Sequence, residues 1–573
     1  MTGRDRPAAA LALLLLAALV VLGAGLGLRD PWPSDEPRFA LVARQMVASG
    51  DWWFPRRGSE LYSDKPPMLM WLQALSYQLT GHWRVAFLLP SLLAGLATLA
   101  LTWDLGRRLW SPRVGLLAAV AVLGAVMFSF QFKRAQIDPL ITALITLANW
   151  GLVVHLLRGP NWPAFWLGCF AAGLGVITKG VGVIALLMLV PYVLLRRAGW
   201  PEVTRTAASG WRWAGGALAV FGAIGLWLVP MAAQALARGT PEYLGYLHDI
   251  LFNQTARRYA GQVGGHESKP LWYFVPVLLL HFFPLSLAYG AAWHDARAAW
   301  RGRDARVALL LGWCALVFVF FTLAGGKREV YVLPMLPMLA LALGPTLQRI
   351  ADAPWLHRTA LAAAAVMAVA LLAAGLWALS GRWTRMDTVM TERGMAEAWP
   401  AMARWMLAAG GLCVVLVAAL RVQRGVQVLL ACLAVVWIAW GVGLAPLGNG
   451  AASAADVMRR ADALAGADGE IALVAWKEQN LLMAPRPVQD FGFKVPPAQQ
   501  FERAVSWLQA APQRRWVFAL SSAVAPCVDE SRVTTVGSSN RRAWWMFQAD
   551  AVRPGCRLPQ PAGRAAEDED EGG

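Results

Sequence analysis

Two acidic side chains, Asp35 and Glu36, lie next to each other where an apolar segment gives way to a polar one. The residues that follow place Phe39, Val42 and Met46 at helical spacing, which predicts an amphipathic helix that begins at the acids. A carboxylate at that position can cap the helix by accepting backbone N–H bonds. It can also act as a general base or orient an acceptor. The local pattern leaves both interpretations open.

A lysine followed by two prolines, Lys65-Pro66-Pro67, closes the same polar segment. The prolines keep the backbone extended, and a lysine fixed there can meet a phosphate as a point charge. Snorkelling at the membrane interface explains the same lysine equally well. Cations recur at the ends of other apolar runs, at Lys133-Arg134, Lys179 and Lys327-Arg328. Positive charge is disfavoured in short outer loops, so this recurrence indicates an anionic partner.

The elements that must position these residues are membrane spans. The chain has 573 residues, of which 57% are hydrophobic and 15% charged, whereas globular domains carry about 25% charged residues. Its apolar runs predict a polytopic α-helical membrane protein with about thirteen transmembrane helices. The expected spans are 8–28, 85–105, 114–131, 139–157, 163–178, 181–195, 213–235, 272–292, 307–323, 330–347, 359–379, 402–420 and 427–447. The first span resembles a signal peptide, but its length and the lack of an A-x-A-like site favour a retained anchor.

Short basic loops orient the spans. They contain Arg107, Arg108 and Arg113; Arg196, Arg197, Arg205 and Arg212; Arg297, Arg301, Arg303 and Arg306; and Arg421 and Arg424. An odd number of spans and a cytoplasmic N-terminus place all of these loops in the cytoplasm of a bacterial inner membrane. The formal net charge of +17 is therefore explained by the arginines in these short loops, which orient a membrane protein. Nucleic acid is not an expected partner, because interleaved basic and aromatic residues on a soluble face are missing.

The same topology divides the chain after residue 447. Residues 1–447 are expected to form a transmembrane domain whose outer loops, 29–84 and 236–271, carry the chemistry. Residues 448–573 are expected to form a small extracytoplasmic α/β domain with a disordered acidic tail. Its expected elements are strands at 471–476 and 515–520 and an amphipathic helix at 498–510.

The six cysteines show no CxxC or zinc-ribbon spacing. Cys527 and Cys556 share the polar C-terminal part, and thiols outside the membrane are commonly oxidised. They are therefore predicted to form a disulfide. The other cysteines lie in apolar runs, which is typical of packing residues: Cys169, Cys314, Cys413 and Cys432.

Taken together, the motifs resemble the aminoarabinose transferases of lipid A, within the wider group related to protein O-mannosyltransferases. The matching motifs are Asp35-Glu36-Pro-Arg38-Phe-Ala, Ser49-Gly-Asp51-Trp, Leu61-Tyr62-x-Asp64-Lys65-Pro-Pro, Arg134-x-x-x-Asp138-Pro, Gly175-x-x-Thr178-Lys179-Gly180 and Gly326-Lys327-Arg328-x-x-Tyr331. The resemblance covers residues 1–350 in motif. It implies a GT-C fold, with many spans, catalytic outer loops and a small extracytoplasmic domain. It also implies transfer of a sugar from undecaprenyl phosphate to an acceptor such as a lipid A phosphate.

The resemblance also implies roles for individual residues. Asp35 matches the catalytic aspartate, with Glu36 and Asp138 as further acids of the site. The expected contacts to the donor phosphate or substrate are Arg38, Tyr62, Lys65, Lys179, Arg257, Arg258, Lys327, Arg328 and Tyr331. Asp64 stands where the family usually has glutamate, which with a later histidine binds a divalent metal. A zinc site formed by Asp64 and His266 is therefore implied, although aspartate is shorter by one methylene.

Two other functions remain as alternatives. A protein O-glycosyltransferase of the same group would use a peptide acceptor, and Asp35 would then be a true base. A lipid or sugar transporter would place ionisable groups near the bilayer midplane on broken helices. The spans of this chain are nearly free of acids and bases, which favours the transferase.

Overall fold

The computed structural model describes residues 5–205, 210–253, 269–420 and 422–559. Seven helices within these ranges are long and apolar enough to cross a membrane, or up to nine if each bent helix pair is one span. The chain is therefore a multi-pass membrane protein, while the count of about thirteen spans stays a prediction. Five of the seven are single helices: α8 (Ile137–Arg158), α11 (Gly210–Arg238), α16 (Ala305–Leu323), α19 (Pro354–Leu379) and α21 (Trp399–Ala419). The other two are Trp83–Leu109, which includes α5 (Leu89–Leu109), and Val422–Ala452, which includes α22 (Gly425–Ala439).

Several expected spans are broken or bent. The first helix, α1 (Asp5–Gly23), ends before residue 28. The span expected at 114–131 consists of two helices that meet at 67°, and the one expected at 272–292 turns by 97°. The remaining bundle elements are α6 (Pro112–Gly124), α7 (Val126–Phe132), α9 (Trp162–Lys179), η1 (Val181–Met188), α10 (Leu189–Arg197), α14 (Phe274–Leu280), α15 (Tyr289–Arg301), η4 (Glu329–Val332), α17 (Met335–Ala342) and α18 (Gly344–Ile350).

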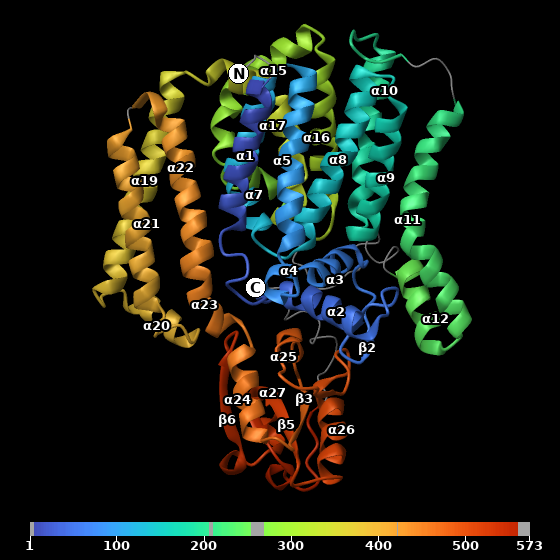
Figure 1. The fold of residues 1–573 in the computed structure, drawn as a ribbon, viewed down its shortest axis with the longest axis vertical. Helices are drawn as coiled ribbons and strands as arrows, with labels where there is room; N and C mark the ends of the chain where they lie inside the picture. Colours follow the sequence, from blue (N-terminus) through green and yellow to red (C-terminus); the bar gives the residue numbers. More distant parts are fainter. Residues whose placement is uncertain (1–4, 206–209, 254–268, 421, 560–573) are drawn as a thin grey trace.

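A layer of short elements, which we call the polar layer, lies between the long helices and the C-terminal part of the chain (Figure 1). It consists of α2 (Glu36–Ser49), β1 (Arg56–Arg57), β2 (Glu60–Leu61), α3 (Met68–Thr80) and α4 (Trp83–Ala86). The apolar face of α2 packs on the bundle, since Phe39, Val42 and Met46 share one buried cluster with Ile137 and Leu140 of α8. The polar layer therefore rests directly on one end of the helical bundle.

The C-terminal part contains a five-stranded sheet with the order β4-β3-β5-β7-β6. Strand β3 is parallel to both of its neighbours, whereas β7 is antiparallel to both of its own. The strands are β3 (Glu470–Val474), β4 (Gln489–Asp490), β5 (Arg515–Leu520), β6 (Thr534–Ser539) and β7 (Arg542–Phe547). We call residues 455–558 the α/β unit. The helix before it, α23 (Ala445–Ala452), continues past residue 447.

Helices cover both faces of this sheet. Alternate residues of β3 point to opposite faces, so Ile471 packs with α24 (Ala455–Ala465) and Ala472 packs with α26 (Pro497–Gln509). The predicted disulfide is confirmed: Cys527 and Cys556 are bonded, with their Cα atoms 5.4 Å apart.

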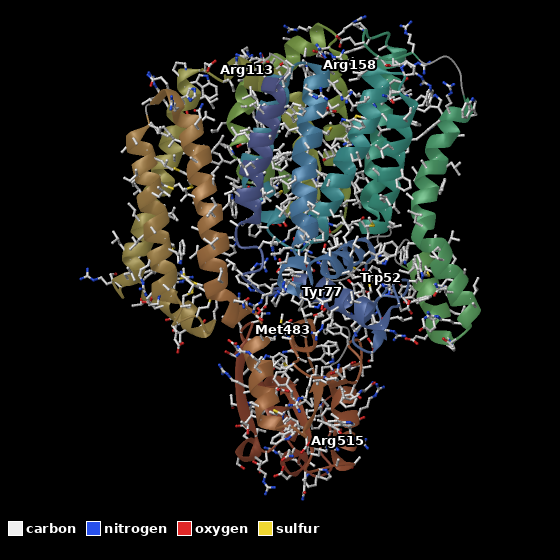
Figure 2. All side chains as sticks on the ribbon, in the orientation of Figure 1. Trp52, Tyr77, Arg113, Arg158, Met483 and Arg515 are labelled. Carbon is white, nitrogen blue, oxygen red and sulfur yellow. A yellow bond between two sulfur atoms is a disulfide. The ribbon has the colours of Figure 1, made fainter. Side chains whose placement is uncertain are left out.

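The two ends of the molecule differ in structure, since the helical bundle forms one and the α/β unit forms the other (Figure 1). In Figure 2, Arg113 and Arg158 lie at the end of the bundle that is opposite to Arg515 of the α/β unit. The first helix, α1, runs from that arginine-rich end toward the polar layer (Figure 1). Helices α19, α21 and α22 flank the bundle on one side, and α11 flanks it on the other.

Candidate active site

The adjacent acids Asp35 and Glu36 have different environments. Glu36 is 1% exposed and receives two hydrogen bonds from Arg29, at 2.5 and 2.8 Å. Backbone N–H groups of Trp32 and Ala135 also donate to its carboxylate. Burial alone would raise the pKa of Glu36, but the Arg29 charge and these bonds outweigh it and hold that pKa below its ordinary value. These four contacts show that Glu36 holds part of the fold together, while the catalytic role expected for it stays a prediction.

Asp35 stands at the N-cap position of α2 but makes no side-chain capping bond. Its carboxylate instead faces two arginines, Arg38 at 3.8 Å and Arg328 at 4.0 Å. The side chain keeps about a fifth of its surface exposed, at 21%. Of the two interpretations left open by the sequence, the structure favours the one in which Asp35 can reach a substrate. The contact between Asp35 and Arg328 also joins the start of α2 to the residues just before η4.

Arg38 and Arg57 converge on a carboxylate from the α/β unit. Arg38 Nε lies 2.9 Å from Glu478 Oε1, and an Arg57 guanidinium nitrogen lies 3.4 Å from the same oxygen. Glu478 begins α25 (Glu478–Leu482) and is 3% exposed. Sequence reasoning missed this residue, since no motif surrounds it. The Glu478 charge offsets two nearby cations and fixes the direction in which Arg38 points.

Tyr62 lies beneath this arginine pair. Its ring is 5.3 Å from the Arg57 guanidinium carbon, and its hydroxyl is buried with no hydrogen-bond partner among the described residues. Burial raises the pKa of Tyr62 well above its ordinary value, with the charges of Asp64 and Asp35 acting in the same direction. Tyr62 therefore stays protonated and can donate a hydrogen bond to a substrate.

Three separate motifs meet at Lys179, the last residue of α9. Its ammonium lies 2.5 Å from Asp138 in the first turn of α8. It also lies 5.0 Å from the ring centre of Tyr331 in η4. The sequence placed Asp138, Lys179 and Tyr331 in one site on motif alone, and the structure brings them together. Asp138 therefore holds the Lys179 ammonium in place, and the catalytic role expected for Asp138 stays a prediction.

The remaining expected cations differ in their burial and in their hydrogen-bond partners. Lys65 is half-buried in the turn before α3, and Lys327 donates to the carbonyl of Lys269 at 2.8 Å. Lys133 is buried and donates to carbonyls at the end of α1, including those of Val21 and Ala24 at 2.8 Å. A structural function thus accounts for Lys133. Three expected site residues lie outside the described residues: Arg257, Arg258 and His266.

The environment of Asp64 bears on the expected zinc site. Arg57 lies 3.6 Å from its carboxylate and Lys494 lies 3.9 Å away, so two cations already face this potential ligand. The described ranges contain no group of three or more His, Cys, Asp or Glu side chains that could hold a metal. A metal ion at Asp64 would have to share this carboxylate with both cations. With His266 undescribed, zinc binding stays a prediction.

The chain is similar to known glycosyltransferases. The family model for dolichyl-phosphate-mannose-protein mannosyltransferase matches residues 64–228. An undecaprenyl phosphate-α-4-amino-4-deoxy-L-arabinose arabinosyl transferase of Edwardsiella ictaluri is 32% identical over 329 residues, 56% of each chain. One from Pseudomonas aeruginosa strain UCBPP-PA14 is 31% identical over 55% of each chain. The matched region thus spans little more than half the length of these curated relatives.

The solved structures extend the likeness to nearly the whole chain. ArnT from Cupriavidus metallidurans, in a crystal structure bound to undecaprenyl phosphate, superposes with a TM-score of 0.69 and 22% identity. That superposition covers 95% of this chain and 99% of ArnT. This chain has the GT-C fold. The Archaeoglobus fulgidus oligosaccharyltransferase shares it more distantly, with a TM-score of 0.51, 13% identity, and 89% and 69% of the two chains covered. The resemblance to aminoarabinose transferases, first seen in the motifs, is confirmed.

Proposed function

We propose that this GT-C chain is a glycosyltransferase that moves 4-amino-4-deoxy-L-arabinose from undecaprenyl phosphate to a lipid A phosphate. The observation that carries the proposal is the position of Asp35, an uncapped, partly exposed carboxylate facing Arg38 and Arg328. The curated relatives carry the name of this activity. A site of this kind combines one acid with several cations, as a sugar phosphate donor requires.

The leaving group in such a transfer is a polyprenyl phosphate, so the site must stabilise phosphate charge as the glycosidic bond breaks. Arg328, Lys179 and Lys65 supply cations for this purpose. A lipid A phosphate is already anionic and needs no base. Asp35 then orients Arg38 and Arg328 and accepts a hydrogen bond from the sugar, rather than removing a proton.

The orientation of the chain in the membrane is part of the proposal. We place the polar layer and the α/β unit outside the cytoplasm of the bacterial inner membrane, with the N-terminus inside. Two observations support this orientation. Arg113 and Arg158 lie at the end opposite to the α/β unit (Figure 2), which matches the positive-inside rule. The Cys527–Cys556 disulfide lies in the α/β unit, and disulfides persist in oxidising compartments.

The test is transfer from undecaprenyl-phosphate aminoarabinose to lipid A by purified protein, followed by mass spectrometry. Asp35→Asn keeps the size of the side chain and removes its charge. We expect transfer to fall about 100-fold, because Arg38 and Arg328 are no longer held in position, with an unchanged melting temperature. Asp550→Asn, in an exposed turn of the α/β unit, is the matched control. Near-normal transfer by well-folded Asp35→Asn protein would refute the role of Asp35.

A second candidate function is protein O-glycosylation. The family model that matches residues 64–228 describes a dolichyl-phosphate-mannose-protein mannosyltransferase. With a peptide hydroxyl as acceptor, Asp35 would act as a general base. Mass spectrometry of envelope proteins and of lipid A, from cells with and without the gene, separates the two acceptors.

A further inference from the structure

A cavity of about 310 Å³ lies beside the candidate site, between β2, α12 (Pro241–His248) and the loop around Lys494. This volume is at the lower end of the range for ligand pockets, about 300–1,000 Å³. Three acidic side chains, Glu60, Glu242 and Asp249, line it together with one lysine. Arg56 lies 3.2 Å from Glu242, so three carboxylates face two cations, and the remaining negative charge favours a cationic ligand over a phosphate.

A tyrosine in the wall of this cavity supplies an independent observation. Tyr246 is 3% exposed, and its hydroxyl has no hydrogen-bond partner in the part of the chain that the structure describes. A buried polar group without a partner costs free energy, so a ligand that donates a hydrogen bond there is favoured. The nearby Tyr62 hydroxyl is in the same state. Tyrosine rings also attract cations through their π-faces.

The cavity is connected electrostatically to the candidate site. Lys494 in the wall of the cavity lies 3.9 Å from the Asp64 carboxylate, and Asp64 lies 3.6 Å from Arg57. Arg57 in turn lies over the Tyr62 ring and shares Glu478 with Arg38, and Arg38 faces Asp35. The acidic cavity and the cations of the candidate site are therefore linked by a continuous series of contacts.

We infer that this acidic cavity binds the protonated amino group of the transferred sugar and so selects amino sugars over neutral ones. The inference rests on the proposed function, which supplies a sugar with a primary amine. An ammonium group carries three hydrogen-bond donors and no acceptor. Those donors match the carboxylates of Glu60 and Glu242 and the unpartnered hydroxyl of Tyr246. The phosphate and the amine of one donor are thereby recognised at two places of opposite charge.

The experiment measures binding of two soluble probes to the full-length protein in detergent by saturation-transfer NMR. The probes are the methyl glycoside of 4-amino-4-deoxy-L-arabinose and that of L-arabinose. We expect the amino glycoside to bind the unsubstituted protein at least about tenfold more tightly, which corresponds to one charge-assisted hydrogen bond. The double variant Glu60→Gln/Glu242→Gln and the single variant Tyr246→Phe are expected to lose most of this preference.

Glu502→Gln is the matched control, because Glu502 is an exposed acid on α26 and its loss should leave the preference intact. Equal binding of both probes by the unsubstituted protein, or an unchanged preference in folded Tyr246→Phe and double-variant protein, overturns the inference. A transfer assay with the same preparations reports separately on the proposed function. A preserved amine preference without any transfer to lipid A or protein would support the cavity and refute the transferase.

Discussion

The polar layer and the α/β unit contact the same candidate site, but they contribute to it in different ways. In the polar layer the site residues stand in short motifs, such as Asp35-Glu36-Pro-Arg38 and Asp64-Lys65-Pro-Pro. The α/β unit contributes Glu478 from a five-residue helix with no motif around it. A motif can therefore reveal site residues that are neighbours in the sequence. It cannot reveal a residue such as Glu478, which comes from a distant part of the chain and is brought to the site only by the fold.

The largest expected effect lies inside the polar layer. Glu36→Ala leaves Arg29 buried without its carboxylate, and breaking a buried ion pair costs about 3–5 kcal/mol. We expect the melting temperature to fall steeply, whereas Asp35→Asn leaves it unchanged. Thermal unfolding in detergent measures the difference, with the exposed Glu502→Ala as control. Equal stability of the Glu36→Ala and Glu502→Ala proteins would show that Glu36 is not structural.

The same ion pair gives a pH dependence. The pKa of Glu36 is lower in the folded protein than its ordinary value of 4.5. Its contribution to stability is therefore fully present above about pH 4.5 and is lost as the pH falls through the folded-state pKa. The stability difference between unsubstituted and Glu36→Ala protein should shrink below that pH.

The second effect concerns the α/β unit alone. Replacing Cys527 and Cys556 by serine removes a cross-link with a sequence separation of 29 residues, which is worth about 3 kcal/mol. We expect limited proteolysis to cut the α/β unit of this variant faster, while the polar layer stays protected. Cys413→Ser, which changes a free buried cysteine, controls for the loss of a thiol. Equal proteolysis of all these proteins would contradict a stabilising cross-link.

The third effect concerns Lys65 in the polar layer and its proposed contact with the donor phosphate. Lys65→Ala removes a charge-assisted contact worth about 1.5–3 kcal/mol, so transfer should fall about 10–100-fold. The loss should appear mainly as a higher KM for the polyprenyl-phosphate donor. Arg514→Ala, in the α/β unit and paired with Glu470, removes a cation away from the site. A normal donor KM in Lys65→Ala protein would leave Lys65 with only an interfacial function.

The smallest effect concerns the contact between Glu478 of the α/β unit and Arg38 of the polar layer. Glu478→Gln keeps a hydrogen-bond acceptor for Arg38 but removes the charge that offsets Arg38 and Arg57. We expect transfer to fall about tenfold, equivalent to about 1.4 kcal/mol, and Glu478→Asp to recover part of it. Kinetics with both variants measure the effect. If transfer by Glu478→Gln matches that of the unsubstituted protein, the α/β unit does not act on the site through this residue.

Much of this architecture could be predicted because membrane spans are encoded locally. Apolar runs located most of the helices, and the topology they implied led to the Cys527–Cys556 prediction. The bends of 67° and 97° could not be predicted, since hydropathy reports composition and not the path of the backbone. The adjacent acids could not be told apart either. Glu36 is structural because Arg29, Trp32 and Ala135 converge on it, and that convergence exists only in the fold.

The pairing of Arg38 with Glu478 also sets an order of events during biosynthesis. The two residues are 440 positions apart in the sequence. At translation rates of about 5–20 residues per second, Glu478 emerges on the order of 20–90 s after Arg38. Over that interval Arg38 and Arg57 lack the carboxylate that faces them in the folded protein. A nascent chain therefore completes this part of the candidate site only after residue 478 has been synthesised, and chains terminated before that point lack the Glu478 charge.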